Sequence, residues 1–178
     1  MTRDVTPGGE QAGEDRETRR ARERALGVTR SVEPLLLDPL ASTVAAARRH
    51  VRLALQELDA DELEESAELG VSELVTNALL HARTPFSVGV CVMPSGRVRI
   101  GVTDTSGRAL RLRRPGTAAT TGRGLRLLES VSTAWGVEAL PAESGGGKTV
   151  WFEPAESMTD AGFAADSWSA EVEGLLEA

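Results

Sequence analysis

Three polar residues recur at four-residue intervals in an otherwise apolar stretch of the chain. They are Glu73, Asn77 and His81, and their neighbours are mainly Leu, Val and Ala. Positions four apart share one face of an α-helix, so these side chains would form a polar row. An Asn amide oxygen can bind Mg²⁺, and a Glu one turn away can serve as a base or orient water. The row predicts a metal and phosphate site; the alternative is a solvated helix face, with His81 as a hydrogen-bonding residue at the helix end.

Two further segments can contribute to the same chemistry. Asp104 ends an apolar alternation and is followed by Ser106-Gly107, where the backbone can turn and a ligand can come close. Its carboxylate can accept a hydrogen bond from an amino group or, alternatively, cap its own turn. Gly122-Arg123-Gly124-Leu125 stands at the start of a short predicted helix. Free N–H groups there favour an anion, although the start of a helix explains these residues equally well.

A second phosphate motif lies near the C-terminal end of this region. Residues 142–149, Ala-Glu-Ser-Gly-Gly-Gly-Lys-Thr, resemble a relaxed P-loop with Ala in place of the first Gly. A P-loop must lead into a helix whose N-terminus holds the phosphates. Here Thr149-Val150-Trp151-Phe152 is β-branched or aromatic and is soon followed by Pro154, which favours a strand. The sequence therefore predicts a hairpin turn at Gly145–Lys148 and not a P-loop.

Hydrophobic periodicity predicts the elements that must position these residues. Two amphipathic helices are expected over Leu40–Leu58 and Leu63–Leu79, with Asp59 and Glu62 forming the cap at the start of the second. The period then changes to alternation, which indicates strands separated by turns. The other expected elements are an edge strand near 32–36, strands at 86–92 and 98–102, a long loop at 105–121, a short helix at 124–131, and strands at 135–140 and 149–152.

This order of elements favours an α+β fold. Helices and antiparallel strands occur in runs rather than in strict alternation, which favours a two-layer sandwich with helices packed on one face of a mixed, mainly antiparallel sheet. The domain is expected over 28–153. It would lie between a flexible or partly helical N-terminal tail at 1–27 and an acidic C-terminal tail at 154–178.

Charge and cysteine content exclude several classes of function. Residues 149–178 carry seven acids and no bases, whereas the rest of the chain carries 20 of each, so the net charge of −7 arises in that segment. The body lacks the basic excess that binding to DNA or RNA requires. No apolar run reaches the roughly 18 residues of a membrane span, and no signal peptide is recognisable, so we expect a cytoplasmic protein. With Cys91 as the single cysteine, neither a disulfide framework nor a cysteine metal cluster can form.

The polar row, the aspartate and the Gly-x-Gly segment, in this order and between these elements, resemble the GHKL-type ATP-binding domain, or Bergerat fold, that histidine kinases and gyrase share. The resemblance covers about 28–153. It is greatest to small actinobacterial proteins that are similar to the anti-sigma-factor serine/threonine kinases, through the segments ARRHVRLAL, SELVTNALLHA, WGVEA and GKTVWFE.

The resemblance implies a role for each residue. Asn77 would bind Mg²⁺ between the phosphate oxygens of ATP, and Glu73 would be the base that receives the proton of an attacking hydroxyl. Asp104 would accept a hydrogen bond from the adenine amino group, and Thr149 would line the adenine end under a lid formed by 105–121. The implied nucleotide-binding set also includes His81, Gly107, Gly122, Arg123, Gly124 and Leu125.

The function that the resemblance implies is a Mg²⁺-ATP-dependent serine/threonine protein kinase that acts as an anti-sigma factor. Its partners would be a small anti-anti-sigma protein of the STAS type, which it phosphorylates, and a sigma factor; a homodimer is also implied. The family turn usually reads D-x-G-x-G, whereas this chain has Asp104-Thr105-Ser106-Gly107-Arg108. The alternative is a non-catalytic ATP-binding regulatory module that works by protein–protein contact.

Overall fold

The structure is a computed structural model that describes residues 16–40, 42–81, 84–104, 123–140 and 146–156. Within these residues, no helix combines the length and the apolar character needed to cross a membrane. The elements in chain order are α1 (Arg16–Leu26), β1 (Arg30–Leu37), α2 (Thr43–Glu57), the 3-10 turn η1 (Asp61–Leu63), α3 (Glu64–His81), β2 (Phe86–Val92), β3 (Val98–Asp104), α4 (Arg123–Ser130), β4 (Ser132–Ala139) and β5 (Lys148–Pro154).

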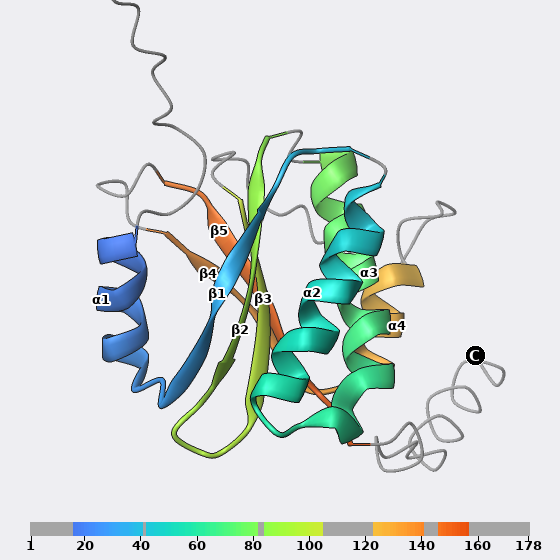
Figure 1. The fold of residues 1–178 in the computed structure, drawn as a ribbon. Coiled ribbons are helices and arrows are strands. Elements are labelled where there is room, and N and C mark those ends of the chain that lie inside the picture. Colours follow the sequence, from blue (N-terminus) through green and yellow to red (C-terminus); the bar gives the residue numbers. More distant parts are fainter. Residues whose placement is uncertain (1–15, 41, 82–83, 105–122, 141–145, 157–178) are drawn as a thin grey trace, which may run out of the picture.

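The five strands form one open sheet in the order β1-β2-β3-β5-β4. All four pairings are antiparallel, so the described sheet contains no parallel pair. The helices α2, α3 and α4 cover one face of the sheet, and α1 lies against the other (Figure 1). The α+β sandwich predicted from the order of elements is thus confirmed.

The hairpin of β2 and β3 forms the centre of the sheet. Alternate residues of both strands, such as Val88 and Ile100, are buried beneath the helices, as the two-residue period predicts. In the turn between them, the Gly96 amide donates to the Met93 carbonyl at 2.9 Å. Gly96 has φ of +83°, a conformation that glycine adopts without the strain that a Cβ would cause.

The helices α2 and α3 form the main cover of the core. Their buried residues recur at three- and four-residue steps, including Val51 and Leu55 of α2 and Val71 and Leu74 of α3. Arg52 of α2 joins the two helices, because its guanidinium contacts Glu64 at 2.8 Å and also Glu68. The helices lie side by side over different strands: α2 over β1 and β2, α3 over β3 and β5, and α4 beyond α3 over β4.

The start of α3 differs from the predicted cap. Asp59 has φ of +57° in the turn after α2, and its carboxylate lies 3.6 Å from Arg30 of β1. The turn η1 then precedes α3, and Ala60 caps it without a side-chain hydrogen bond. The prediction that Asp59 and Glu62 cap the helix is wrong, because a local sequence pattern does not reveal that the chain reverses direction at Asp59.

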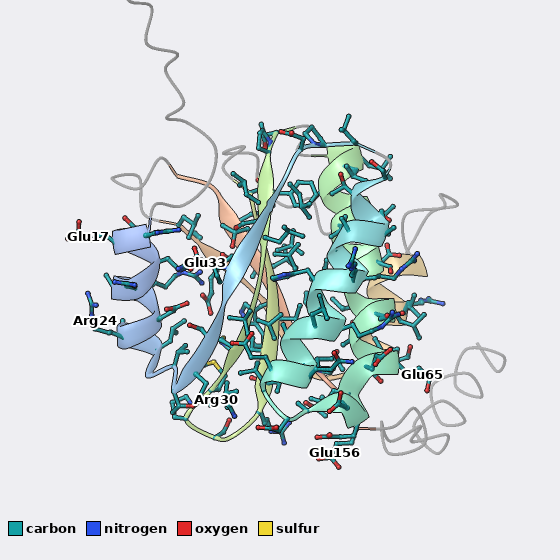
Figure 2. All side chains as sticks on the ribbon, in the orientation of Figure 1. Glu17, Arg24, Arg30, Glu33, Glu65 and Glu156 are labelled. Atoms are coloured by element: carbon teal, nitrogen blue, oxygen red, sulfur yellow. The ribbon has the colours of Figure 1, made fainter. Side chains whose placement is uncertain are left out.

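The N-terminal segment contributes a helix to the face of the sheet opposite α2 and α3. Residues 16–26, expected to belong to a flexible or partly helical tail, form α1, none of whose residues is buried. Ion pairs join it to the sheet: Arg19 contacts Glu33 of β1 at 2.9 Å, and Arg22 contacts Glu138 of β4 at 3.8 Å. In Figure 2 the Glu33 side chain lies between β1 and α1. Residues 1–15 and the tail from 157 onward lie outside the described residues.

Both edge strands are irregular. In β1 the register with β2 shifts between Val32 and Leu35, and this interval contains Pro34, which has no backbone N–H to donate. In β4 the register with β5 shifts between Ser132 and Ala134. Each edge strand therefore departs from a regular ladder within its own length.

Candidate functional site

Two side chains of the polar row, Glu73 and Asn77, lie on the flank of α3 that faces away from α2. Ser72 and Glu68 face α2, where Ser72 accepts from Arg48 at 3.5 Å and Glu68 contacts Arg52. Glu73 and Asn77 each follow one of these residues by five positions, which is roughly 140° around an α-helix. Both are half-buried. Because α4 is the next helix beyond α3, the row is directed toward α4.

Asp104 lies at the end of the sheet where α3 ends. The last residue of α3, His81, is separated from Phe86 by only four residues, and Phe86 pairs with Asp104. The neighbouring strand β5 begins there too, because Asp104 pairs with Lys148. The C-terminal half of α3 and the ends of β3 and β5 therefore meet at one end of the domain, on the side covered by helices.

The start of α4 is directed toward the same end. The helix ends beside Ser132, which pairs with Pro154 at the far end of β5, so its N-terminal turn is the part nearer to Asp104 (Figure 1). Leu128 is fully buried and fixes α4 against α3 and β4. Arg123, Gly124 and Leu125 form the first turn, as predicted. Their side chains, the side chain of His81, and Gly107 and Gly122 lie outside the described residues.

A buried ion pair occupies the end of β3. Lys148 Nζ lies 2.8 Å from Asp104 Oδ2 and donates to Asp104 Oδ1 at 3.1 Å. The side chains are only 5% exposed for Asp104 and 12% exposed for Lys148. A carboxylate that leaves water needs such a partner, because an unpaired buried charge costs several kcal/mol, on the order of 3–5 kcal/mol.

Lys148 is a site residue that the sequence prediction did not identify. The segment Gly145–Lys148 was assigned to a turn, whereas Lys148 is the first residue of β5 and its side chain contacts Asp104. The strand, rather than a helix, that follows Lys148 confirms that this segment is not a P-loop. One signal was available: Lys148 is the single lysine in a chain whose other 19 basic residues are all arginine.

Thr149, which the resemblance implied would line the adenine end, lies on the face of the sheet opposite to Lys148. Successive strand residues point to opposite faces, and Phe152, which the Gly70 backbone of α3 approaches, defines the helix side of β5. Lys148 shares that side, whereas Thr149 points away from it. Its buried hydroxyl lies 2.8 Å from the hydroxyl of Thr103. Because strand side chains alternate between the two faces, these threonines lie beneath α1 and Asp104 lies beneath α3.

Asn77 is the described side chain that could contribute to a magnesium site. Among the described residues, no group of three or more His, Cys, Asp or Glu side chains could hold a metal by itself. Mg²⁺ in nucleotide sites commonly takes one or two protein oxygens and completes its shell with phosphates and water. Asn77 provides one amide oxygen at a half-buried position, which is compatible with such a site.

Cys91 and His50 carry side chains that can react or titrate, but both are partly buried away from the candidate site. Burial raises the pKa of the Cys91 thiol to about 11, so this side chain is neutral at physiological pH and is a weak nucleophile. Burial also lowers the pKa of His50 on α2, against a smaller opposing effect of a hydrogen bond with the Val88 backbone. His50 is therefore a neutral side chain between α2 and β2.

Comparison with known proteins gives one relative and no family description. An uncharacterized protein of Streptomyces coelicolor is 40% identical over 90 residues, which cover 48% of this chain and 81% of that protein. No family model matches the chain.

Proposed function

The chain belongs to the same family as the Streptomyces coelicolor protein, and we propose that it is a cytoplasmic Mg²⁺-ATP-dependent serine/threonine protein kinase that acts as an anti-sigma factor. Its substrate would be a small anti-anti-sigma protein of the STAS type, and a sigma factor would be the second partner. One observation carries this proposal. Glu73 and Asn77, one turn apart on the flank of α3 facing α4, lie at the end of the domain that holds the buried carboxylate of Asp104.

The proposed role of each side chain follows from its chemistry. Asn77 would donate its amide oxygen to the ion that neutralises charge on the phosphates. Glu73 would accept the proton of the substrate serine or threonine hydroxyl. The hydroxyl oxygen would bond to the γ-phosphorus of ATP as the bond between that phosphorus and the ADP oxygen breaks. Asp104 would accept from the amino group of the base. Phosphoryl transfer depends mainly on positioning and charge, and a general base adds roughly 10²- to 10⁴-fold to the rate.

The first prediction separates base catalysis from nucleotide binding. We expect Glu73→Gln to bind Mg²⁺-ATP with unchanged affinity but to lose roughly 10²- to 10⁴-fold in phosphate transfer, because only proton acceptance is removed. Asn77→Ala should lose affinity for ATP in Mg²⁺ but not in EDTA. Calorimetry and transfer of labelled phosphate to a STAS-type protein measure these effects.

Glu65→Gln is the matched control, because Glu65 is an exposed carboxylate in the first turn of the same helix (Figure 2), whereas Asn77 belongs to its C-terminal half. It should retain both binding and transfer. Equal transfer by the wild type and Glu73→Gln would contradict the proposed mechanism.

A second candidate is a regulatory module that binds ATP and a partner without transferring phosphate. The turn from Asp104 to Arg108, which lacks both glycines of the family pattern in their usual places, favours it. A stable complex with the partner in Mg²⁺-ATP, with no phosphoprotein formed, would distinguish this module from the kinase.

A further inference from the structure

The carboxylate of Asp104 and the ammonium of Lys148 form an ion pair that places a hydrogen-bond acceptor and a hydrogen-bond donor side by side at the end of the candidate site. The two side chains are cross-strand neighbours on the helix side of the sheet, and Nζ lies within 3.1 Å of both carboxylate oxygens. This inference rests on the proposed function, since it concerns which nucleotide base that site accepts.

Asp104 would discriminate between purines if it stood alone. The 6-amino group of adenine is a donor, which a carboxylate accepts, whereas the 6-oxo group of guanine is an acceptor, which a carboxylate repels. Leaving polar groups without partners costs roughly 1–3 kcal/mol, or about 5- to 150-fold in affinity. An aspartate that faced the 6-position alone would therefore select ATP over GTP.

Lys148 changes this selection because it adds a donor to the same edge. An ammonium can donate to the 6-oxo group of guanine, and the carboxylate can then accept from the adjacent ring N–H. For adenine, the carboxylate accepts from the amino group, and the ammonium can donate to the neighbouring ring nitrogen. A carboxylate has about four lone-pair positions on two oxygens, so it can bind Lys148 and a base together.

The burial of the pair opposes its separation when a nucleotide binds. Both side chains are almost removed from water, so moving Lys148 away would take from the buried carboxylate a charged partner that offsets the cost of its burial. We propose that Lys148 is a specificity-determining residue that allows the site to take 6-oxopurine as well as 6-aminopurine triphosphates.

The test compares the affinities for Mg²⁺-ATP and Mg²⁺-GTP, measured by calorimetry on the full chain. In the wild type, we expect the two dissociation constants to agree within roughly 10-fold. Lys148→Met, which removes the donor but keeps much of the side-chain volume, should shift the ratio toward ATP by roughly 10- to 100-fold. Lys148→Arg should restore the wild-type ratio, because it returns a cation with donors.

Thr149→Ser is the matched control, because Thr149 is the next residue of β5 but points to the opposite face; it should leave the ratio unchanged. A wild-type preference for ATP of more than about 10-fold would overturn the inference while leaving the kinase proposal intact. The inference would also be overturned, and the kinase proposal left intact, if Lys148→Met had the same ratio of GTP to ATP dissociation constants as the wild type. If neither nucleotide binds, both proposals fail. If Lys148→Met does not fold, the wild-type ratio still decides.

Discussion

The hydroxyl pair of Thr103 and Thr149 lies on the face of the sheet that α2 and α3 leave uncovered. Both side chains are buried, and each oxygen has the other as a partner at 2.8 Å. Thr149→Val keeps the shape but leaves the Thr103 hydroxyl without this partner, which should lower the free energy of unfolding by about 1–3 kcal/mol. Nucleotide affinity should not change. Urea unfolding and calorimetry measure the two quantities, and a loss of ATP binding at unchanged stability would contradict this assignment to the opposite face.

The imidazole of His50 makes stability depend on pH. Burial lowers its pKa below the ordinary 6.5, so the unfolded chain binds a proton at a higher pH than the folded chain does. Stability is then lost as the pH falls below about 6.5 and until it reaches the lower pKa of the folded chain. His50→Gln should show a smaller loss between pH 7 and pH 5 in chemical denaturation. An identical pH profile in the two proteins would show that His50 does not titrate on unfolding.

At the scale of elements, the contact between α3 and β5 depends on the absence of a side chain at Gly70. A Cβ there would overlap the ring of Phe152, which is fully buried in the core. Replacing a helical glycine with alanine normally stabilises a helix by about 1 kcal/mol, whereas forcing an extra carbon into a filled core costs about 1–3 kcal/mol. We expect the second effect to dominate, so that Gly70→Ala lowers the melting temperature.

The double variant Gly70→Ala/Phe152→Leu tests the reason for this loss. Leucine removes part of the ring volume, so the two substitutions together should cost less than the sum of their separate effects. Strictly additive costs, measured by urea unfolding, would mean that the contact with Phe152 does not limit residue 70.

Helix α1 is held mainly by charge, and its attachment should therefore depend on salt. Arg19 donates to both carboxylate oxygens of Glu33, at 2.9 and 3.3 Å, and this lowers the pKa of Glu33. Exposed ion pairs of this kind contribute little stability each and are weakened by salt. Amide hydrogen exchange in α1 should rise roughly 2- to 5-fold in Arg19→Ala and at 1 M salt, while exchange in α3 stays constant.

Arg24→Ala is the control for this experiment. Arg24 belongs to the last turn of the same helix, and its side chain points away from the sheet (Figure 2). The substitution should leave exchange in α1 at the wild-type rate. If the exchange rate rose equally in Arg19→Ala and Arg24→Ala, the rate would depend on the intrinsic helix stability of α1 and not on the ion pair that attaches α1 to the sheet.

For the whole molecule, the fold was more predictable than the arrangement of the site. Apolar periodicity located α2, α3 and all five strands because burial on one face of each element imposes that period. The site depends on register as well. A shift of one residue moves a side chain to the other face, so whether Lys148 or Thr149 shares a face with Asp104 depends on a strand pairing that the sequence pattern does not specify. The charge pairs that hold α1 join residues distant in sequence, so no local pattern reveals them.

The irregular outer strands also govern how copies of the chain meet. A flat edge strand with regularly spaced backbone N–H and C=O groups can pair with a strand of a second molecule, and repeated pairing of this kind produces fibres. Here β1 contains Pro34, which has no backbone N–H to donate, and β4 carries a register shift between Ser132 and Ala134, an irregularity of the kind that interrupts regular pairing at a sheet edge. Polymerisation by edge-to-edge addition of strands should therefore be disfavoured at both edges of the sheet.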